Sequence, residues 1–409
     1  MSMMFQFHPY VENANLPKDI KRELIMLFSS HLGKAYSRTR HSVAPLGIKT
    51  QKARVVNLLA MFTELRKAKF EITSVSGLKE KHVEFLLKKW VDEKQTKGTI
   101  ENKITYLGTL AAWTKRPNVV KKASEYPILD ALEKRSGIAK EDKSWTSAGV
   151  NVDDVISNIA AEDATIGVQL ALAVTFGLRV EEALLMRPLD AVTRESGQYF
   201  VTIENGTKGG RRRKVAIHNL ERQIEVIELA KGFINRKSKT TIPLEYSLKS
   251  WKSRFYNVLA KHGVTKTGKH GVTAHGLRHQ YLNDLYKHIT KQESPVRGGE
   301  APAPDILRLA RQTITEAAGH SVESKACAYV GSHRAMRAKA AKDLTDEEIL
   351  TKLKECCGIK MKAAEELKCS RNFLYTRLRA IDTTKTEKTQ IIDNELSTVS
   401  VDKLVSKGR

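Results

Sequence analysis

Hydrophobic residues recur at helical spacing through the first 116 residues of the chain. In segment 50–68 the apolar positions are three or four residues apart, at Val55, Leu58, Leu59, Phe62 and Leu65. This spacing places them on one face of a helix. Segments 76–93 and 99–116 repeat the pattern, with charged residues on the other faces. The pattern predicts a small helical domain over residues 17–133.

A second pattern begins near residue 150 and predicts a mainly helical domain with a small β-hairpin or sheet. Two apolar runs, 199–203 and 214–218, flank the glycine-rich ENGTKGGRRR, which is typical of a β-hairpin. The expected fold class is therefore mainly α, with an α+β domain over 150–344. Its expected helices cover 153–161, 163–176, 179–186, 220–235, 248–261, 275–289, 305–318 and 323–342.

The remaining segments lack a sustained apolar pattern. We expect an N-terminal arm over 1–16, a lysine-rich linker over 134–149, and a disordered tail over 382–409. A helical segment is expected over 345–381. The stretch 291–305 holds three prolines and two glycines, which predicts a loop.

Charge narrows the range of partners. The 409 residues include 70 Lys and Arg against 46 Asp and Glu, a formal net charge of +24, which favours a polyanion such as nucleic acid. The longest nearly apolar run, 166–178, is too short to span a bilayer, and the first residues do not resemble a signal peptide. The four cysteines lack the paired spacing of a zinc site. We therefore expect a soluble, cytoplasmic protein without a metal site.

Residue types suited to phosphate chemistry occur in four stretches. Each alone has an ordinary explanation, such as a surface ion pair, a solvated cation or a packed tyrosine. The ordered set is much less probable by chance. Its members are Arg179 and Glu182 in FGLRVEEAL, Lys208 in GTKGGRRRKV, His275 and Arg278 in HGLRH, and His320 and Tyr329 in AAGHSVESKACAYVGS.

This ordered set resembles the signature of the tyrosine recombinase, or phage integrase, family. That signature is an arginine in a G-L-R-x-x-E box, a hairpin lysine, an H-x-x-R box, a G-H pair and a tyrosine nine residues after that histidine. The resemblance covers about residues 150–340, and the helical region 17–116 resembles the family's core-binding domain. The chain departs from the pattern at 291–305, which looks like an insertion between Arg278 and His320.

The resemblance implies metal-free and ATP-independent cutting of DNA, with no cofactor. A phenol has a pKa of about 10 in water, so its attack on phosphorus at neutral pH needs assistance. Fixed positive charge and proton transfer supply that assistance. The implied roles are as follows: Tyr329 attacks and forms a 3′-phosphotyrosyl link, Arg179 and Arg278 hold the phosphate oxygens, His275 accepts the phenolic proton, Lys208 protonates the leaving 5′-oxygen, His320 hydrogen-bonds the phosphate, and Glu182 supports the site.

Two further groups are candidate DNA contacts. The hairpin carries Arg211, Arg212 and Arg213. Segment 361–381, MKAAEELKCSRNFLYTRLRAI, resembles the helix-turn-helix of bacterial regulators, which implies contacts with a DNA groove or backbone. The alternative for this segment is a helical hairpin that packs on protein. Its candidate DNA-binding residues are Arg371, Asn372 and Arg377.

The expected function is that of a site-specific DNA recombinase or integrase of a bacterial mobile element. Expected partners are double-stranded DNA sites, three further copies of the chain in a tetramer on DNA, and accessory DNA-bending or directionality proteins. The free protein is expected to be monomeric and no membrane partner is expected. Two alternatives stay open: a non-catalytic DNA-binding regulator, and relaxation of DNA by a type IB topoisomerase mechanism.

Overall fold

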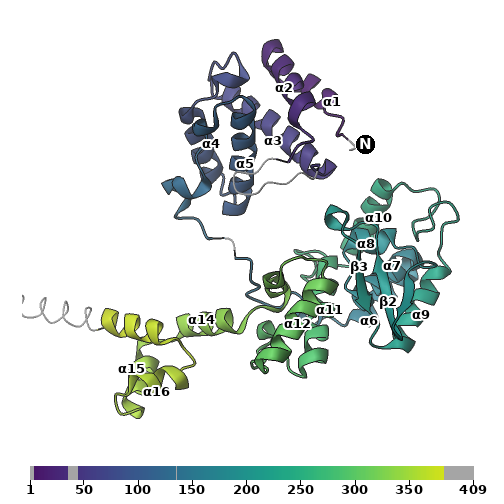
Figure 1. Ribbon diagram of the computed structural model, residues 1–409, viewed down its shortest axis with the longest axis vertical. Helices are drawn as coiled ribbons and strands as arrows, with labels where there is room; N and C mark the ends of the chain where they lie inside the picture. The colour runs from purple at the N-terminus through teal and green to yellow at the C-terminus, as the bar shows by residue number, and fades with distance from the viewer. Residues whose placement is uncertain (1–3, 36–44, 135, 382–409) are drawn as a thin grey trace, which may run out of the picture. The chain divides into compact units, whose positions relative to one another are not determined.

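The computed structural model describes residues 4–35, 45–134 and 136–381, and the chain forms two compact units that divide between Ser136 and Gly137 (Figure 1). Both units are built mainly from helices, and the second unit also holds a three-stranded sheet. This agrees with the predicted fold class. The predicted tail over 382–409 lies outside the described residues.

The first unit is a helical domain built on apolar stripes. Its helices are α1 (His8–Glu12), α2 (Lys18–His31), α3 (Ile48–Lys67), α4 (Glu80–Asp92) and α5 (Lys97–Trp113). All five apolar positions predicted for α3 are buried, together with Leu24 and Phe28 of α2 and Leu86 and Trp90 of α4. The predicted N-terminal arm is wrong in its described part, because Phe7, Val11 and Leu16 are buried in this core.

The second unit begins with helices around one long, buried helix. The apolar run near 166–178 forms α7 (Ala164–Phe176), which packs against α6 (Val152–Glu162), α8 (Val180–Leu185), α9 (Leu220–Lys231) and α11 (Ala274–Thr290). A run that is apolar on every face is expected to be buried in this way. Further helices are α10 (Leu248–Lys261), α12 (Pro304–Ala317), α13 (Cys327–Val330) and α14 (His333–Asp343), and the terminal helices of residues 346–381 follow them.

The sheet of the second unit is antiparallel in the order β1-β2-β3. Its strands are β1 (Val192–Glu195), β2 (Gln198–Ile203) and β3 (Arg213–Ala216), with Val201 opposite Val192 on one side and Val215 on the other. The predicted hairpin corresponds to β2 and β3. Strand β1 was not predicted. A tight turn joins it to β2, and Ser196 and Gly197 in this turn both have positive φ.

The structure corrects two other boundaries. The predicted linker 134–149 is, from Gly137 onward, part of the second unit, since Trp145 is fully buried and its indole nitrogen donates to Thr273 O at 2.8 Å. The helix predicted over 323–342 is broken at Gly331, where φ is +74°. The break leaves α13 as a separate helix of four residues.

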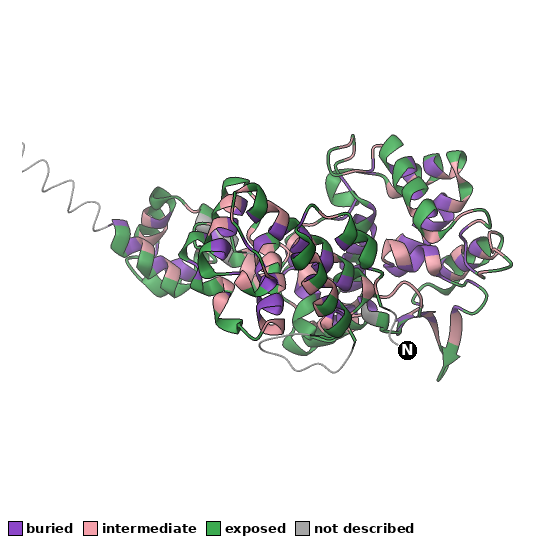
Figure 2. Cartoon of the chain, turned by 90° about the horizontal axis from the view of Figure 1, so that it is seen from above, coloured by how far each residue is buried: buried purple, intermediate pink, exposed green. Residues whose placement is uncertain are grey.

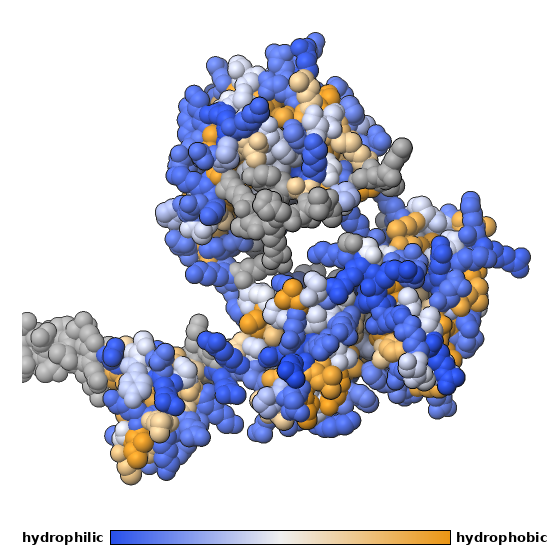
Figure 3. Space-filling model, viewed as in Figure 1, coloured by the Kyte–Doolittle hydropathy of each residue, from blue (hydrophilic) through white to orange (hydrophobic). Residues whose placement is uncertain are grey.

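Burial separates three apolar clusters in the second unit. Figure 2 draws the buried residues of the chain in purple. One cluster lies around α7, and a second joins α11, α12 and α13. The third belongs to the terminal helices, by which we mean α15 (Asp346–Glu355), α16 (Lys360–Glu366) and the helix of residues 371–381. Hydrophilic side chains cover most of the visible surface (Figure 3). Within the described residues, no helix is long and apolar enough to cross a membrane.

Candidate active site

A buried carboxylate organises the first part of the site. Helix α7 ends at Gly177, which has a left-handed conformation, and α8 starts directly after Arg179. The Glu182 side chain is fully buried and accepts hydrogen bonds from Arg179 N at 2.8 Å and from Arg179 Nη1 at 2.6 Å. From strand β3, Arg213 Nη1 and Nη2 donate to the two Glu182 oxygens at 2.7 and 2.6 Å.

These contacts keep Glu182 ionised. Burial raises the pKa of the Glu182 carboxyl, but the hydrogen bonds and charges of Arg213 and Arg179 outweigh burial and lower that pKa to about 2. A carboxylate held in this way fixes the orientation of both guanidinium groups. Glu182 is therefore a structural anion that positions Arg179.

Arg278 completes a group that we call the arginine cluster: Arg179, Arg213 and Arg278 around Glu182. Arg278 lies on α11 with its side chain fully buried, and its Nη1 donates to Gly177 O at 2.5 Å. Its Nη2 donates to Ala318 O, and Arg179 Nη2 reaches the same carbonyl at 2.9 Å. Three guanidinium groups around one carboxylate leave two positive charges in excess, which favours binding of an anion.

The hydroxyl of Tyr329 lies at this cluster. Tyr329 is 6% exposed and sits on α13, and its hydroxyl accepts a hydrogen bond from Arg278 Nε at 3.2 Å. The hydroxyl is also 3.3 Å from His320 Nε2. His275 approaches through its ring, with a centroid 6.2 Å from that of Tyr329. The structure therefore brings together five of the six predicted catalytic residues.

Burial and the neighbouring cations make the histidines poor proton binders. For both His275 and His320, desolvation by burial is the largest cause of the lowered pKa. The positive charges of Arg278 and Arg179 lower it further, and each pKa is about 4. The His275 side chain nevertheless keeps an exposed surface. At neutral pH both imidazoles are uncharged, so either one is able to accept a proton.

A third histidine faces Tyr329 and was not predicted as a site residue. His279 is 6% exposed, its ring centroid is 5.0 Å from that of Tyr329, and its Nδ1 is buried without a hydrogen-bond partner in the described part of the chain. Burial lowers its pKa to about 4. The spacing of four residues from His275, one helical turn, is the signal that could have identified it.

The hairpin lysine is placed differently from the other five. Lys208 begins a short 3-10 helix, Lys208–Gly210, between β2 and β3, and its side chain is exposed. Among the described residues it has no hydrogen bond or ion pair, but its charge contributes to the lowered pKa of His320. Lys208 is thus near the site without contacting it in this structure.

The three hairpin arginines have three different environments. Arg211 is exposed, and Arg212 is exposed but paired with Glu204. The prediction that Arg213 contacts DNA is corrected, since its side chain is 4% exposed, bound to Glu182, and its Nε donates to Ala317 O at 2.8 Å. Arg213 is instead a structural member of the arginine cluster.

The three DNA-binding residues predicted in the terminal helices also differ in their exposure and contacts. Arg371 and Asn372 are exposed at the start of the helix of residues 371–381. Arg377 contacts Asp346 of α15 through an ion pair at 2.6 Å, and its Nε is buried without a partner in the described residues. Its guanidinium is therefore engaged within the protein, unlike the other two.

Comparison with known proteins adds sequence evidence to this geometry. Residues 137–284 match a family model described as integrase, and residues 40–120 match one described as phage integrase, N-terminal. The two matches together span more than half of the chain. No curated protein matches it.

Several solved structures are similar to the chain. An XerH site-specific recombinase bound to its difH substrate is 16% identical, with 82% of this chain and 93% of that chain covered and a TM-score of 0.45. A lambda integrase dimer bound to a core site is 12% identical, with coverages of 76% and 95% and a TM-score of 0.48. The Tn1549 transposon integrase bound to transposon end DNA is 13% identical, with 78% of this chain and 99% of that chain covered and a TM-score of 0.46.

These identities are low, so the assignment depends on the two sequence models and on the set of residues around Tyr329. The integrase model includes Arg179, Lys208, His275 and Arg278. His320 and Tyr329 lie beyond its matched range, and the fold brings them to the same cluster. The chain therefore belongs to the phage integrase family of site-specific tyrosine recombinases.

Proposed function

We propose that Tyr329 is the nucleophile with which this recombinase cuts and rejoins DNA. One observation carries the proposal: the Tyr329 hydroxyl lies between Arg278 Nε and His320 Nε2, beside the arginine cluster, in which Arg213 and Arg278 are buried and Arg179 is 20% exposed. Two other tyrosines of α11 are less suited. Tyr286 contacts His333, and burial raises the pKa of Tyr281, whose ring packs against Gly177.

The proposed reaction exchanges one phosphate ester for another. The Tyr329 oxygen forms a bond to the scissile phosphorus while the bond from phosphorus to the 5′-oxygen breaks. A neutral imidazole takes the phenolic proton, and Lys208 gives a proton to the departing 5′-oxygen. The products are a 3′-phosphotyrosyl link and a free 5′-hydroxyl, and attack by a 5′-hydroxyl in the reverse direction rejoins the strand without ATP.

The arginine cluster stabilises charge on the phosphate. Arg179 uses Nη1 for Glu182 and Nη2 for Ala318 O, and its side chain is 20% exposed, so its remaining N–H groups are available to non-bridging oxygens. Arg278 is fully buried, with Nη1 and Nη2 on backbone carbonyls, and it acts on the phosphate through its charge and through the Nε that contacts the Tyr329 hydroxyl. Because these contacts hold both guanidinium groups before DNA binds, little reorganisation is needed in the transition state.

Two histidines are candidates for the proton acceptor. The family resemblance assigns this role to His275 and a phosphate contact to His320. In this structure His320 Nε2 lies 3.3 Å from the Tyr329 hydroxyl, whereas the contact of His275 with Tyr329 is between the two rings. We retain His275 as the acceptor, and the variants described in the Discussion distinguish the two.

The proposed partners follow from the reaction and the charge. Exchange of four strands requires four nucleophiles, and each chain supplies one, Tyr329. We propose a tetramer on two double-stranded DNA sites that forms from monomers when DNA is present. The excess of 24 positive charges supports DNA binding. Integration or excision of a bacterial mobile element in the cytoplasm, with accessory DNA-bending or directionality proteins, is the proposed setting.

We further propose that the terminal helices bind DNA as a helix-turn-helix. Helix α16 and the helix of residues 371–381 are joined by a short turn in which Lys368 has a φ of +51°. Apolar residues of both helices pack with α15, and Arg371 and Asn372 lie on the exposed side. We do not include Arg377 among the contacts, because it is paired with Asp346.

Covalent trapping tests the central proposal. A DNA site with a nick beside the cleavage position loses a short fragment after cutting, so the protein–DNA adduct accumulates. We expect an adduct with the wild-type protein and with Tyr286→Phe, and none with Tyr329→Phe, while all three bind DNA equally. An adduct formed by Tyr329→Phe would assign the nucleophile to another residue.

A further inference from the structure

The proposed nucleophile, Tyr329, lies on a helix that is too short to be stable without contacts from other segments. Helix α13 has four residues, Cys327–Val330, and a helix of this length is unstable in isolation. Its flanks are also irregular, with a 3-10 helix before it and the break at Gly331 after it. The placement of Tyr329 therefore depends on what the backbone of α13 contacts.

Three segments contact that backbone. Ala139 N, from the segment that opens the second unit, donates to Cys327 O at 2.8 Å. Asn283 Nδ2, from α11, lies 3.5 Å from Tyr329 O. The loop predicted over 291–305 is the segment 291–303 between α11 and α12, since α12 already begins at Pro304. Gly331 packs against Val296 of this loop 291–303, since a Cβ on that glycine would be 2.7 Å from Val296 Cγ1. The same Cβ would lie 3.3 Å from Ala139 O, so the opening segment and the loop both pack beside Gly331 at the end of α13.

Asn283 connects α13 to the loop. Its side chain is fully buried, its Nδ2 also donates to His279 O at 2.8 Å, and its Oδ1 accepts from Ser294 Oγ at 2.5 Å. One amide therefore joins the helix of the catalytic His275 and Arg278, the carbonyl of Tyr329 and the inserted loop. Few side chains other than an amide could donate and accept in these directions.

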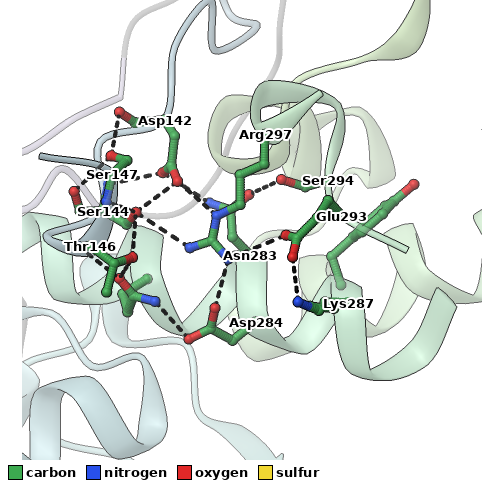
Figure 4. Close-up of polar contacts among 12 residues, drawn as sticks. Asp142, Ser144, Thr146, Ser147, Asn283, Asp284, Lys287, Glu293, Ser294 and Arg297 are labelled. Carbon is green, nitrogen blue, oxygen red and sulfur yellow. Dashed lines mark hydrogen bonds and ion pairs between the residues drawn. The ribbon is translucent and has the colours of Figure 1, made fainter. Parts of the chain in front are cut away.

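Arg297 connects the loop to the opening segment. Its Nε donates to Asp142 Oδ2 at 2.7 Å, its Nη1 to Asp284 Oδ1 at 2.7 Å, and its Nη2 to Ser144 Oγ at 3.3 Å (Figure 4). The Arg297 and Asp142 side chains are 16% and 6% exposed. Figure 4 shows the guanidinium between the segment that carries Asp142 and Ser144 and the helix that carries Asn283 and Asp284.

We propose that Arg297 and Asn283 are positioning residues for Tyr329. Arg297 holds loop 291–303 against Asp142, and Asn283 transmits that arrangement to the Tyr329 backbone. Neither contacts the hydroxyl or the arginine cluster, so they act on the reaction only through the position of α13. The inserted loop, which the family resemblance leaves without a role, becomes the support of the nucleophile. This inference rests on the proposed role of Tyr329.

The test compares the rate of covalent adduct formation at saturating DNA for Asn283→Ala, Arg297→Ala and Arg297→Lys. Lys287→Ala is the matched control, since it removes an exposed ion pair to Glu293 on the same helix and loop. We expect the two alanine variants to lower the rate constant at least tenfold, Arg297→Lys to lower it less, and Lys287→Ala to leave it unchanged. DNA affinity and the fraction of folded protein should stay the same.

A second substrate separates positioning of the nucleophile from protonation of the leaving group. Sulfur in place of the 5′-bridging oxygen leaves as a thiolate, and because thiols are far more acidic than alcohols, no proton donor is needed. Lys208→Ala should recover most of its rate on this substrate, whereas Asn283→Ala and Arg297→Ala should not. Recovery of those two variants, or rates within twofold of wild type on the ordinary substrate, would overturn the positioning role.

The failure of this inference differs from a failure of the proposed function. If the wild-type protein forms no adduct that depends on Tyr329, the proposed nucleophile is wrong. If the wild-type adduct forms and the Asn283 and Arg297 variants match it, only the positioning role is wrong. Variants that simply unfold would lose adduct amplitude in proportion to folded protein, without a change in the rate constant of the folded fraction, and this outcome also contradicts positioning.

Discussion

Replacing Glu182 by glutamine removes one charge from the arginine cluster while keeping nearly the same shape. The amide still accepts one hydrogen bond, but Arg179, Arg213 and Arg278 then share no counterion within the cluster. Buried cations without a partner destabilise the folded state. We therefore expect both lower stability and slower cleavage, since Arg179 loses the carboxylate that orients it.

The magnitude follows from the pKa of Glu182. Its folded value of about 2 is 2.5 units below the ordinary 4.5, and at roughly 1.4 kcal/mol per unit this corresponds to about 3 kcal/mol of stability at pH 7. Because the folded pKa is depressed, the contribution is present above the unfolded pKa and is lost as the pH falls toward 2. At pH 3.5 about 2 kcal/mol should remain.

Denaturant unfolding at pH 7 and pH 3.5 measures this contribution. Glu182→Gln should lose about 3 kcal/mol at pH 7, and its difference from wild type should shrink at pH 3.5. Glu195→Gln is the control, since Glu195 forms an exposed pair with Lys214 and is expected to contribute less than about 1 kcal/mol. A loss below 1 kcal/mol in Glu182→Gln, or a loss that does not change with pH, would refute the account of the arginine cluster.

Two further predictions concern the histidines and the terminal helices. The pKa values of His275 and His320 are lowered to about 4, so the cleavage rate should stay nearly constant from pH 7 to about pH 5 and fall as these imidazoles gain protons near pH 4. A fall of the rate centred near pH 6.5 would contradict neutral, desolvated histidines. His275→Gln should flatten that profile if His275 is the acceptor, whereas the same result in His320→Gln alone would transfer the role. Deletion of 345–409, or Arg371→Ala with Asn372→Ala, should leave adduct formation on a nicked site but reduce site preference, and unchanged site preference would remove the terminal helices from DNA recognition.

Sequence reasoning worked best where one local pattern determines one element. The α3 stripe is buried as predicted because an apolar face at helical spacing has few other uses. The hairpin was also found from its glycine-rich turn. Strand β1 was missed because none of its four residues is buried, so it lacks the alternating apolar pattern that β3 shows at the same length, although the Ser196–Gly197 turn gave a recognisable signal.

Other features depend on contacts that the sequence does not display. Arg211, Arg212 and Arg213 are adjacent and chemically identical, yet only Arg213 points inward on β3 and binds a buried carboxylate. The polar segment after Gly137 looks like a linker, but Trp145 and Asp142 anchor it to α11 and to loop 291–303. Burial of polar residues against distant partners is set by tertiary structure, so local patterns cannot predict it.

The end of α12 explains why the arginine cluster and Tyr329 lie close together. Ala317 O and Ala318 O, at the negative end of this helix, accept from Arg213, Arg179 and Arg278, so the helix dipole favours the positive charge that gathers there. Gly319 follows with a φ of +61°, and a Cβ there would lie 3.0 Å from Arg213 Cδ, so glycine suits both the turn and the close approach. His320 and α13 come next in the chain. The loop before α12 joins the helix at its other end, so the carbonyls that hold the arginines are placed by the helix itself and not by that loop.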